Sequence, residues 1–436
     1  MRAMSALRGR LPALAGEAAV YVGANMLNAL LPFLLVPILT RALGPQQYGV
    51  VAIFTVTVTV FAAMAGLNSN SAVTVRYFQL DPDHLRAYLG TCLAILAVST
   101  LGILLLLTPL RSLIARHTEV PPTWLFVAVG VAVLNFVTSL RLILWQVARR
   151  PWAYSALTVG QSAVYLIVAV VLVDGFGMGW EGATAGLALG ALVAGSASAV
   201  LLWRSGAIRL MVSVADIRDA LAYGVPLIPH MIGGLLIAGA DRLLLTGMLG
   251  VDQAGIYMVA LQIGMGLGLV TGAFNKAYMP WLLGQLERGD PARDVRIVRA
   301  TYLYGVGLFA SASVLSLAAP WLVRLIGGAA FADAARAVPW IAFAYAFGGM
   351  YYMVTNYVFH AGKTAYLAWV TLAAGCFGIL TTYLRIPAVG MIGAGQGYLL
   401  SHMLMFGGTW ALAQHVRPMP WLQALRRGAG GSVAET

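Results

Sequence analysis

Long runs of hydrophobic residues alternate with short polar connections along almost the whole chain. A helix needs about 20 mostly apolar residues to cross the hydrocarbon core of a bilayer. Twelve stretches meet this requirement, and their bounds are about 18–40, 48–68, 87–109, 122–146, 153–173, 180–203, 220–246, 254–280, 300–326, 338–360, 365–385 and 389–414. The pattern therefore predicts an all-α integral membrane protein with twelve transmembrane helices.

The composition agrees with a membrane protein rather than a soluble one. Hydrophobic residues make up 60% of the 436 residues and charged residues only 10%, whereas soluble chains carry roughly 25% charged residues. The net charge of +12 would suggest nucleic acid as a partner of a soluble protein. Here Lys and Arg lie mostly between the apolar runs, so the expected partner is the lipid bilayer and not nucleic acid. The only cysteines, Cys92 and Cys376, lie inside apolar runs and predict neither disulfides nor a metal site.

The distribution of Lys and Arg predicts the orientation in the membrane. If the N-terminus is cytoplasmic, eighteen of these residues fall in inner segments and seven in outer segments. Positively charged residues are enriched on the cytoplasmic side of membrane proteins. We therefore expect both termini to be cytoplasmic.

An internal repeat is the strongest sign of domain organisation. Three segments recur in chain order at nearly constant spacing. Leu43–Gly49 recurs as Leu249–Gly255 at an offset of 206 residues, and Ala153–Tyr154 recurs as Ala365–Tyr366 at 212. At an offset of 211, the set Gly179, Gly182, Ala183 and Gly186 recurs as Gly390, Gly393, Ala394 and Gly397. Matches in register indicate duplication into an N-terminal bundle, 1–207, and a C-terminal bundle with a tail, 208–436. Six helices per half predict a parallel, pseudo-two-fold repeat, as in carriers that work by alternating access.

Two prolines lie in the first helix of each predicted half: Pro32 and Pro37 in the first half, and Pro226 and Pro229 in the second. Proline removes a backbone donor and bends a helix. The bends either gate a cleft between the halves or are the ordinary kinks of membrane helices.

Polar side chains lie near the predicted bilayer midplane, at Asn25, Asn28, Asn135, Gln161, His230, Gln262 and His402. Their amides and imidazoles could bind sugar hydroxyls in a wet cavity. The competing interpretation is hydrogen bonding between helices, which contributes about 0.6 kcal/mol per bond.

Charged residues within spans are costly and are functional candidates. Arg141 and Lys276 lie deeper than the other cations, so a cationic cavity for an anionic substrate competes with snorkelling to the headgroups. Asp241 and Arg242 are adjacent near the outer end of the seventh span.

The sequence contains no phosphate-binding loop, metal spacing or nucleophile elbow. We therefore expect a transporter and not an enzyme, without a cofactor. A proton or sodium gradient could drive it, with Asp241, His230 or His402 titrating.

Two stretches resemble signatures of a known family. Thr40–Gly49 is similar to the first signature of polysaccharide-transport proteins, the Wzx-type lipid-linked oligosaccharide or O-antigen flippases of the multidrug/oligosaccharidyl-lipid/polysaccharide (MOP) exporter superfamily. Asp241–Tyr257 resembles the matching signature of their second half.

The resemblance implies a MOP-exporter-like fold in the bacterial inner membrane. It implies transfer of an undecaprenyl-pyrophosphate-linked oligosaccharide from the cytoplasmic to the periplasmic leaflet, with a polysaccharide polymerase as a further partner. Arg141 and Lys276 would line the inward-facing cavity, and Asp241–Arg242 would have a gating or pairing role.

Two other functions compete with the flippase. A multidrug and toxin extrusion antiporter would have the same fold, but such pumps favour acidic cavities, and basic residues outnumber acidic ones within these spans. A glycan polymerase or ligase would require a large outer loop with a basic cluster, and the connections here are short.

Overall fold

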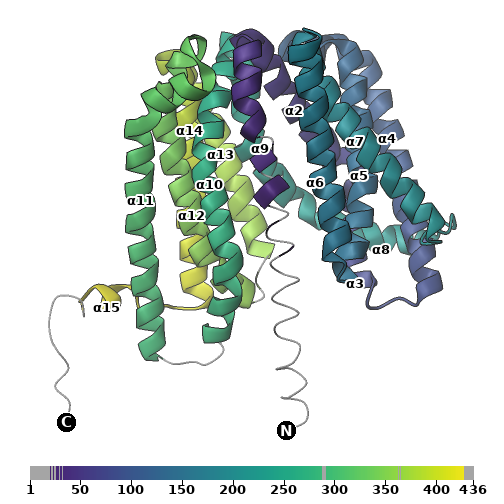
Figure 1. Ribbon diagram of the computed structural model, residues 1–436. Helices are drawn as coiled ribbons and strands as arrows, with labels where there is room; N and C mark the ends of the chain where they lie inside the picture. Colours follow the sequence, from purple (N-terminus) through teal and green to yellow (C-terminus); the bar gives the residue numbers. More distant parts are fainter. Residues whose placement is uncertain are drawn as a thin grey trace. The chain divides into compact units, whose positions relative to one another are not determined.

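The computed structural model describes residues 20, 23, 26–28, 30–31, 33–286, 291–361, 363 and 365–426. All regular structure among these residues is helical, which confirms the all-α class (Figure 1). After a first helix, Met26–Ala42, the elements are α2 (Pro45–Met64), η1 (Ala65–Asn68), α3 (Asn70–Arg76), α4 (Pro82–Thr118), α5 (Pro122–Val147), α6 (Pro151–Val170), η2 (Val171–Gly175), α7 (Gly179–Arg204), α8 (Val214–Gly224), η3 (Val225–Leu227), α9 (Ile228–Leu249), α10 (Val251–Leu286), α11 (Pro291–Gly327), η4 (Ala329–Arg336), α12 (Val338–His360), α13 (Ala365–Val389), α14 (Met391–Val416) and α15 (Trp421–Arg426).

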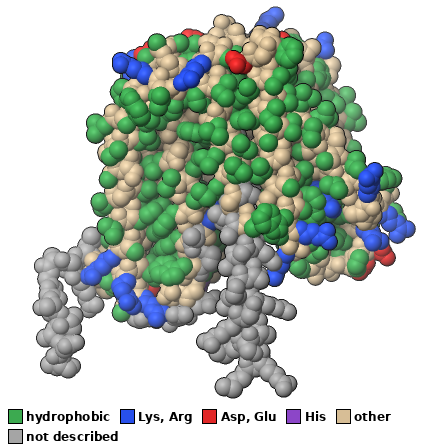
Figure 2. All heavy atoms as spheres, viewed as in Figure 1, with side chains coloured by type: hydrophobic (Ala, Val, Ile, Leu, Met, Phe, Trp, Pro, Cys, Tyr) green, Lys and Arg blue, Asp and Glu red, His purple; other side chains and the backbone are tan. Residues whose placement is uncertain are grey.

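The helices are long and apolar enough for a membrane protein. Within the described ranges, nine helices can cross a bilayer by length and composition, and η4 with α12, bent by 53°, makes a tenth. Met26–Ala42 is a shorter apolar helix, and α14 is long enough but rich in glycine and polar residues. Each predicted span therefore overlaps a helix among the described residues. On the face shown in Figure 2, hydrophobic side chains cover most of the middle, and Lys and Arg lie mainly towards the upper edge and the lower part.

The predicted helix 220–246 is wrong in its boundaries. The structure breaks it into α8, the 3-10 turn η3 and α9, with Pro226 inside the turn. Proline has no N–H for the helical hydrogen-bond ladder, and its ring crowds the preceding turn. The apolar span therefore begins later, and Met231–Leu249 is the part that can cross the bilayer.

The chain divides into two compact units. Unit 1 comprises Met1–Leu235, Arg242–Met258 and Ile326–Ala330, and unit 2 comprises Leu236–Asp241, Val259–Leu325 and Phe331–Thr436. The domain boundary after residue 207 stays a prediction.

The core of unit 1 is formed where α2, α5 and α7 meet. Ile53 and Phe54 of α2 are fully buried. Phe54 packs edge-to-face on Trp124 of α5, with ring centroids 5.7 Å apart, and Trp124 packs on Trp180 of α7 at 5.4 Å. These aromatic contacts fix three helices against one another.

The short helix α8 is held on unit 1 by charged hydrogen bonds. Arg76, the last residue of α3, donates from Nε and Nη2 to the two carboxylate oxygens of Asp219 at 2.8 and 2.6 Å. The Tyr88 hydroxyl donates to the same carboxylate at 2.9 Å. The bond from Arg76 lowers the pKa of Asp219 below its ordinary value. Because a lowered pKa keeps the carboxylate ionised until the pH falls below the usual aspartate range, this contact persists throughout the neutral range.

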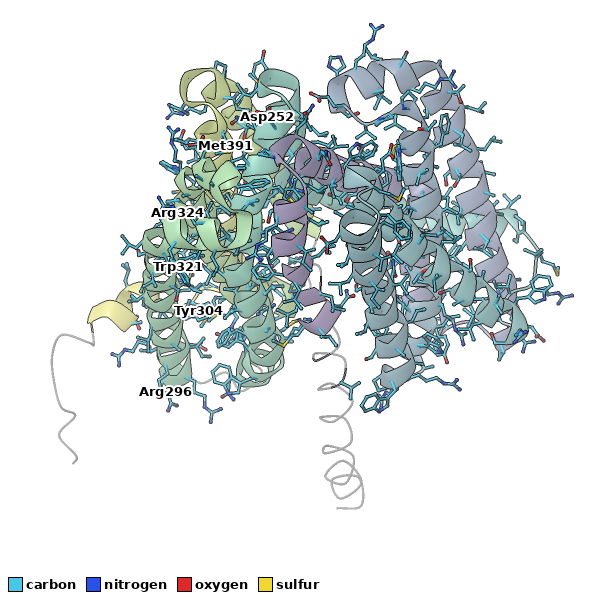
Figure 3. The ribbon with its side chains drawn as sticks, turned by 45° about the horizontal axis from the view of Figure 1, so that its top comes forward. Asp252, Arg296, Tyr304, Trp321, Arg324 and Met391 are labelled. Atoms are coloured by element: carbon cyan, nitrogen blue, oxygen red, sulfur yellow. The ribbon has the colours of Figure 1, made fainter. Side chains whose placement is uncertain are left out.

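Unit 2 is built around α12, whose buried residues Met353, Val354, Tyr357 and Val358 pack with those of α10, α11, α13 and α14. The longest helix of the unit is α11, with Arg296 and Arg324 towards its opposite ends (Figure 3). A rise of about 1.5 Å per residue separates them by about 42 Å, close to the full thickness of a bilayer with its headgroups.

The repeated segments occupy corresponding places in the two halves. Leu43–Gly49 and Leu249–Gly255 lead into α2 and α10, Ala153 and Ala365 lie in the first turns of α6 and α13, and the Gly-Ala pattern begins α7 and α14. Gly179 and Gly390, at the matched starts of α7 and α14, both have φ of +61°, a conformation that glycine adopts without strain. The repeated segments therefore lie at corresponding helix starts, and the division into two six-helix bundles stays a prediction.

Candidate functional site

A polar cavity lies inside unit 1, between the first helix and α2, α5, α6 and α7. Its volume is about 430 Å³, which is within the range of ligand-binding pockets. The lining residues are Asn28, Thr55, Val58, Thr59, Asn135, Leu142, Thr158, Gln161, Ser162, Tyr165, Leu187 and Ala191. We call this space the amide cavity.

Hydrogen bonds join the helices across the amide cavity. Gln161 Nε2 donates to Asn135 Oδ1 at 3.1 Å, which connects α6 to α5. The Ser162 hydroxyl donates to Asn28 Oδ1 and connects α6 to the first helix. Three amides proposed from the sequence for a substrate cavity are therefore brought together by the fold.

The lining of the amide cavity carries amides and hydroxyls but no charged side chain among the described residues. An amide offers both donors and acceptors, and a hydroxyl can donate and accept. A sugar presents several hydroxyls in fixed directions, so this lining is chemically suited to a carbohydrate. Among the described lining residues there is no carboxylate for an organic cation, and Tyr165 is the one aromatic side chain.

None of the hydroxyls that line this cavity was predicted from the sequence. Thr158, Gln161, Ser162 and Tyr165 follow the spacing i, i+3, i+4 and i+7, which places them on one face of α6. This polar stripe is visible in the sequence and could have identified the face. Thr55 and Thr59 form a matching i, i+4 pair on α2.

The other proposed cavity residues lie elsewhere. Arg141 lines a separate cavity of unit 1, near the end of α5. Gln262 and Lys276 belong to unit 2, where Gln262 is half-buried and Lys276 is exposed on α10. Asn25 lies outside the described residues.

A buried carboxylate lies inside unit 2. Asp241 of α9 is only 5% exposed and lines a space of about 10 Å³ with Thr382 of α13 and Ser401 of α14, among other residues. Such a volume is sufficient for about one water-sized particle. A carboxylate beside two hydroxyls supplies the oxygen ligands that a proton-carrying water or a small cation requires.

The remaining gating and coupling candidates are dispersed. His402 is buried on α14, where its Nδ1 lies 2.9 Å from the Tyr398 carbonyl oxygen and its ring packs on the Tyr398 ring. Arg242 is half-buried in unit 1. Pro37 is in the first helix and Pro226 in η3, while Pro32 and the side chains of Pro229 and His230 lie outside the described residues. Their gating role stays a prediction.

Comparison with known sequences matches one family over more than half of the chain. The family described as "Polysaccharide biosynthesis protein" matches residues 14–284. "Lsg locus putative protein 1" of Haemophilus influenzae is 21% identical over 277 residues, covering 62% of this chain and 66% of that relative, just under two thirds. An uncharacterized membrane protein of the same organism is 20% identical over 392 residues, covering 87% of this chain and 93% of the relative.

Solved structures show the same fold at low sequence identity. The structure "Lipid II flippase MurJ, inward closed conformation" aligns with a TM-score of 0.69 and 10% identity, covering 95% of this chain and 94% of the other. An inward-facing multidrug resistance MATE family transporter of the MOP superfamily aligns with a TM-score of 0.59 and 15% identity, covering 95% and 96%.

Proposed function

We propose that this chain, which belongs to the polysaccharide biosynthesis protein family and has the fold of MOP-type transporters, is a flippase for a lipid-linked oligosaccharide. It would transfer an undecaprenyl-pyrophosphate-linked glycan from the cytoplasmic to the periplasmic leaflet of a bacterial inner membrane, by alternating access. The chain would carry out no covalent chemistry, and both termini would be cytoplasmic. A polysaccharide polymerase would then receive the transferred glycan.

The observation that carries this proposal is the family match, which covers residues 14–284 and therefore most of the predicted N-terminal bundle. The amide cavity, with its uncharged amides and hydroxyls, supports a carbohydrate substrate. The described lining holds no carboxylate, whereas a multidrug antiporter would favour an acidic cavity, so the lining favours the flippase although the MATE transporter has a similar fold. Driving such a transfer against a gradient requires a coupled ion, and Asp241 is our candidate for the group that binds it.

Removing the amides of the cavity should slow glycan transfer. We expect Gln161→Leu and Asn135→Leu each to lower the rate of transfer by about tenfold, because a sugar hydroxyl that loses its partner costs about 1–3 kcal/mol, and 1.4 kcal/mol is one factor of ten. The measurement uses the purified full chain in proteoliposomes with a fluorescent undecaprenyl-pyrophosphate oligosaccharide. A reagent outside the vesicles reports the fraction of exposed glycan over time.

Gln146→Leu is the matched control, because Gln146 is an exposed amide on the same helix as Asn135. It should leave the rate unchanged. Unaltered transfer in both cavity variants, with wild-type thermal stability, would remove the amide cavity from the mechanism. Wild-type protein that transfers no oligosaccharide at all would contradict the flippase itself.

Neutralising Asp241 should uncouple transfer from the ion gradient. Asp241→Asn preserves the shape of the side chain but removes its charge and its proton exchange, so imposed proton or sodium gradients should no longer accelerate transfer. Asp252→Asn, at an exposed carboxylate in the first turn of α10, should retain the wild-type acceleration (Figure 3). The same vesicles, with and without each gradient, provide the measurement. Full acceleration in Asp241→Asn would exclude this carboxylate as the coupling group.

A further inference from the structure

A second cavity of unit 1 lies where α4 begins and α5 and α7 end. Its volume is about 460 Å³, and it shares no lining residue with the amide cavity among the described residues. Leu80, Leu85, Leu89 and Leu144 give it apolar walls, and Arg86, Arg141 and Arg150 give it positive charge. None of the described residues that line it is acidic. We call this space the arginine cavity.

Arg141 has an unsatisfied hydrogen-bonding position in the arginine cavity. Its guanidinium carbon lies 4.4 Å from the centroid of the Trp145 ring, one helical turn further along α5. Its Nε is buried and has no hydrogen-bond acceptor within the described part of the chain. A buried donor without an acceptor is costly, and the cost is greater when the group is charged. An anion in the cavity that Arg141 lines would pair with its guanidinium and offset part of this cost.

A second cation makes an anionic occupant more favourable. Arg150 lines the same cavity and repels Arg141 electrostatically. Arg86, in contrast, already pairs with Asp83 at 3.0 Å. Two arginines without a carboxylate in the described lining match a phosphate group, because guanidinium donors form paired hydrogen bonds with phosphate oxygens.

The position of the cavity indicates where the phosphate would come from. Three aromatic side chains lie within two positions of lining residues and are strongly exposed: Phe78 at 74%, Trp152 at 76% and Trp203 at 70%. Exposed tryptophans at helix ends are typical of the membrane–water interface, where lipid headgroups lie. Basic pockets at this depth, with apolar walls for acyl chains, bind anionic lipids.

We propose that the arginine cavity binds the phosphate headgroup of an anionic phospholipid, with Arg141 as the principal contact and Arg150 as the second. Ser205 and Ala207, in the segment between α7 and α8, also line the cavity. The next part of this segment is attached to α4, since Arg209 N donates to Arg86 O at 2.9 Å. The bound lipid therefore stabilises the connection between α4, α5 and the segment that leads into the second half. This role is separate from glycan transfer.

Thermal unfolding of the purified full chain in neutral detergent tests this proposal. Phosphatidylglycerol should raise the unfolding temperature in a saturable manner, whereas phosphatidylcholine and inorganic phosphate should have a much smaller effect. Arg141→Gln should raise the half-saturating concentration of phosphatidylglycerol at least tenfold. Arg324→Gln, at an exposed arginine of α11, should leave it unchanged.

Measurement without lipid separates binding from a structural role. Arg141→Gln should be close to wild type in stability in lipid-free detergent, because the substitution removes a buried donor without an acceptor as well as the contact of the guanidinium with Trp145. If this variant is much less stable, Arg141 is structural and the proposal fails. Arg150→Gln is the second variant, since its exposed side chain can be replaced without repacking, and it should weaken the lipid effect by about threefold.

Two further results would overturn the proposal. Identical phosphatidylglycerol curves for wild type, Arg141→Gln and Arg150→Gln would exclude the arginine cavity as the binding site. Equal stabilisation by inorganic phosphate and phosphatidylglycerol would identify a free-anion site and not a lipid site. Because the readout does not involve the glycan, a failure of the flippase proposal would leave these results interpretable.

Discussion

Gly49→Ala and Gly255→Ala are each expected to destabilise the protein by about 3 kcal/mol or more, and to abolish most of the folded yield. These glycines lie where the first turns of α2 and α10 cross within unit 1. A Cβ at Gly49 would lie 1.9 Å from the Val251 carbonyl oxygen, and a Cβ at Gly255 would lie 2.0 Å from the Pro45 carbonyl oxygen. Both obstacles are backbone atoms, so no side-chain rotation relieves the overlap.

The contact is reciprocal, because Pro45 and Gly49 correspond to Val251 and Gly255 in the repeat. Each of the two turns therefore presents the same two backbone positions to the other, as expected around a local two-fold axis. Either substitution alone separates the two turns. The double variant should consequently be little worse than each single variant, a non-additivity typical of residues in direct contact.

Gly266→Ala provides the control for this crossing. Gly266 lies on the same helix as Gly255, and a Cβ there would meet nothing within 4 Å. It should be neutral or slightly stabilising, since alanine favours helix by about 1 kcal/mol over glycine. Thermal unfolding and the yield of monodisperse protein in detergent measure all four variants. Wild-type stability in Gly49→Ala would contradict the backbone-to-backbone crossing.

The second large effect is expected from Gly393→Ala in α14. Its Cβ would lie 2.6 Å from both the Arg385 carbonyl carbon and the Ile386 nitrogen of α13. Small residues let membrane helices approach closely, and this gain is lost when the helices are forced apart. The helix pair α13–α14 should separate locally, which lowers the unfolding temperature and exposes the backbone of both helices to hydrogen exchange.

Gly407→Ala is the matched control in the same helix, because a Cβ there meets nothing within 4 Å. Gly186→Ala tests a similar close approach in the first half, where a Cβ would lie 2.8 Å from the Ala169 nitrogen of α6. It should cause the same kind of defect in α6 and α7. Unchanged hydrogen exchange in α13 of the Gly393→Ala variant would show that this close approach does not stabilise the pair.

The repeat and most helix bounds could be predicted from sequence, because the responsible signals are local. The structure places α12 at Val338–His360, the predicted bounds, since an apolar run is flanked there by helix-starting and helix-ending residues. The predicted run 87–109 extends in the structure to Pro82–Thr118. Its start was missed because the Asp81 side chain accepts hydrogen bonds from the Asp83 and His84 backbone N–H groups, a cap that lies outside the apolar run.

The partners of the polar residues could not be predicted. Asn28, Asn135 and Gln161 were expected to share one cavity with Arg141, yet the fold places Arg141 in another. Asn135 and Arg141 are six residues apart on α5, and that spacing places them on different faces of the helix. Which neighbour each face meets depends on the packing of helices distant in sequence.

The pattern of apolar residues was sufficient to predict the membrane class and most apolar spans, and it indicates a duplication. Which side chains converge, as in the amide cavity, the arginine cavity and the surroundings of Asp241, depends on how the helices pack. The difference arises from the solvent. Lipid is as apolar as the protein core, so a spanning helix can be hydrophobic all round, and the periodicity that reveals the inner face of a soluble helix is lost.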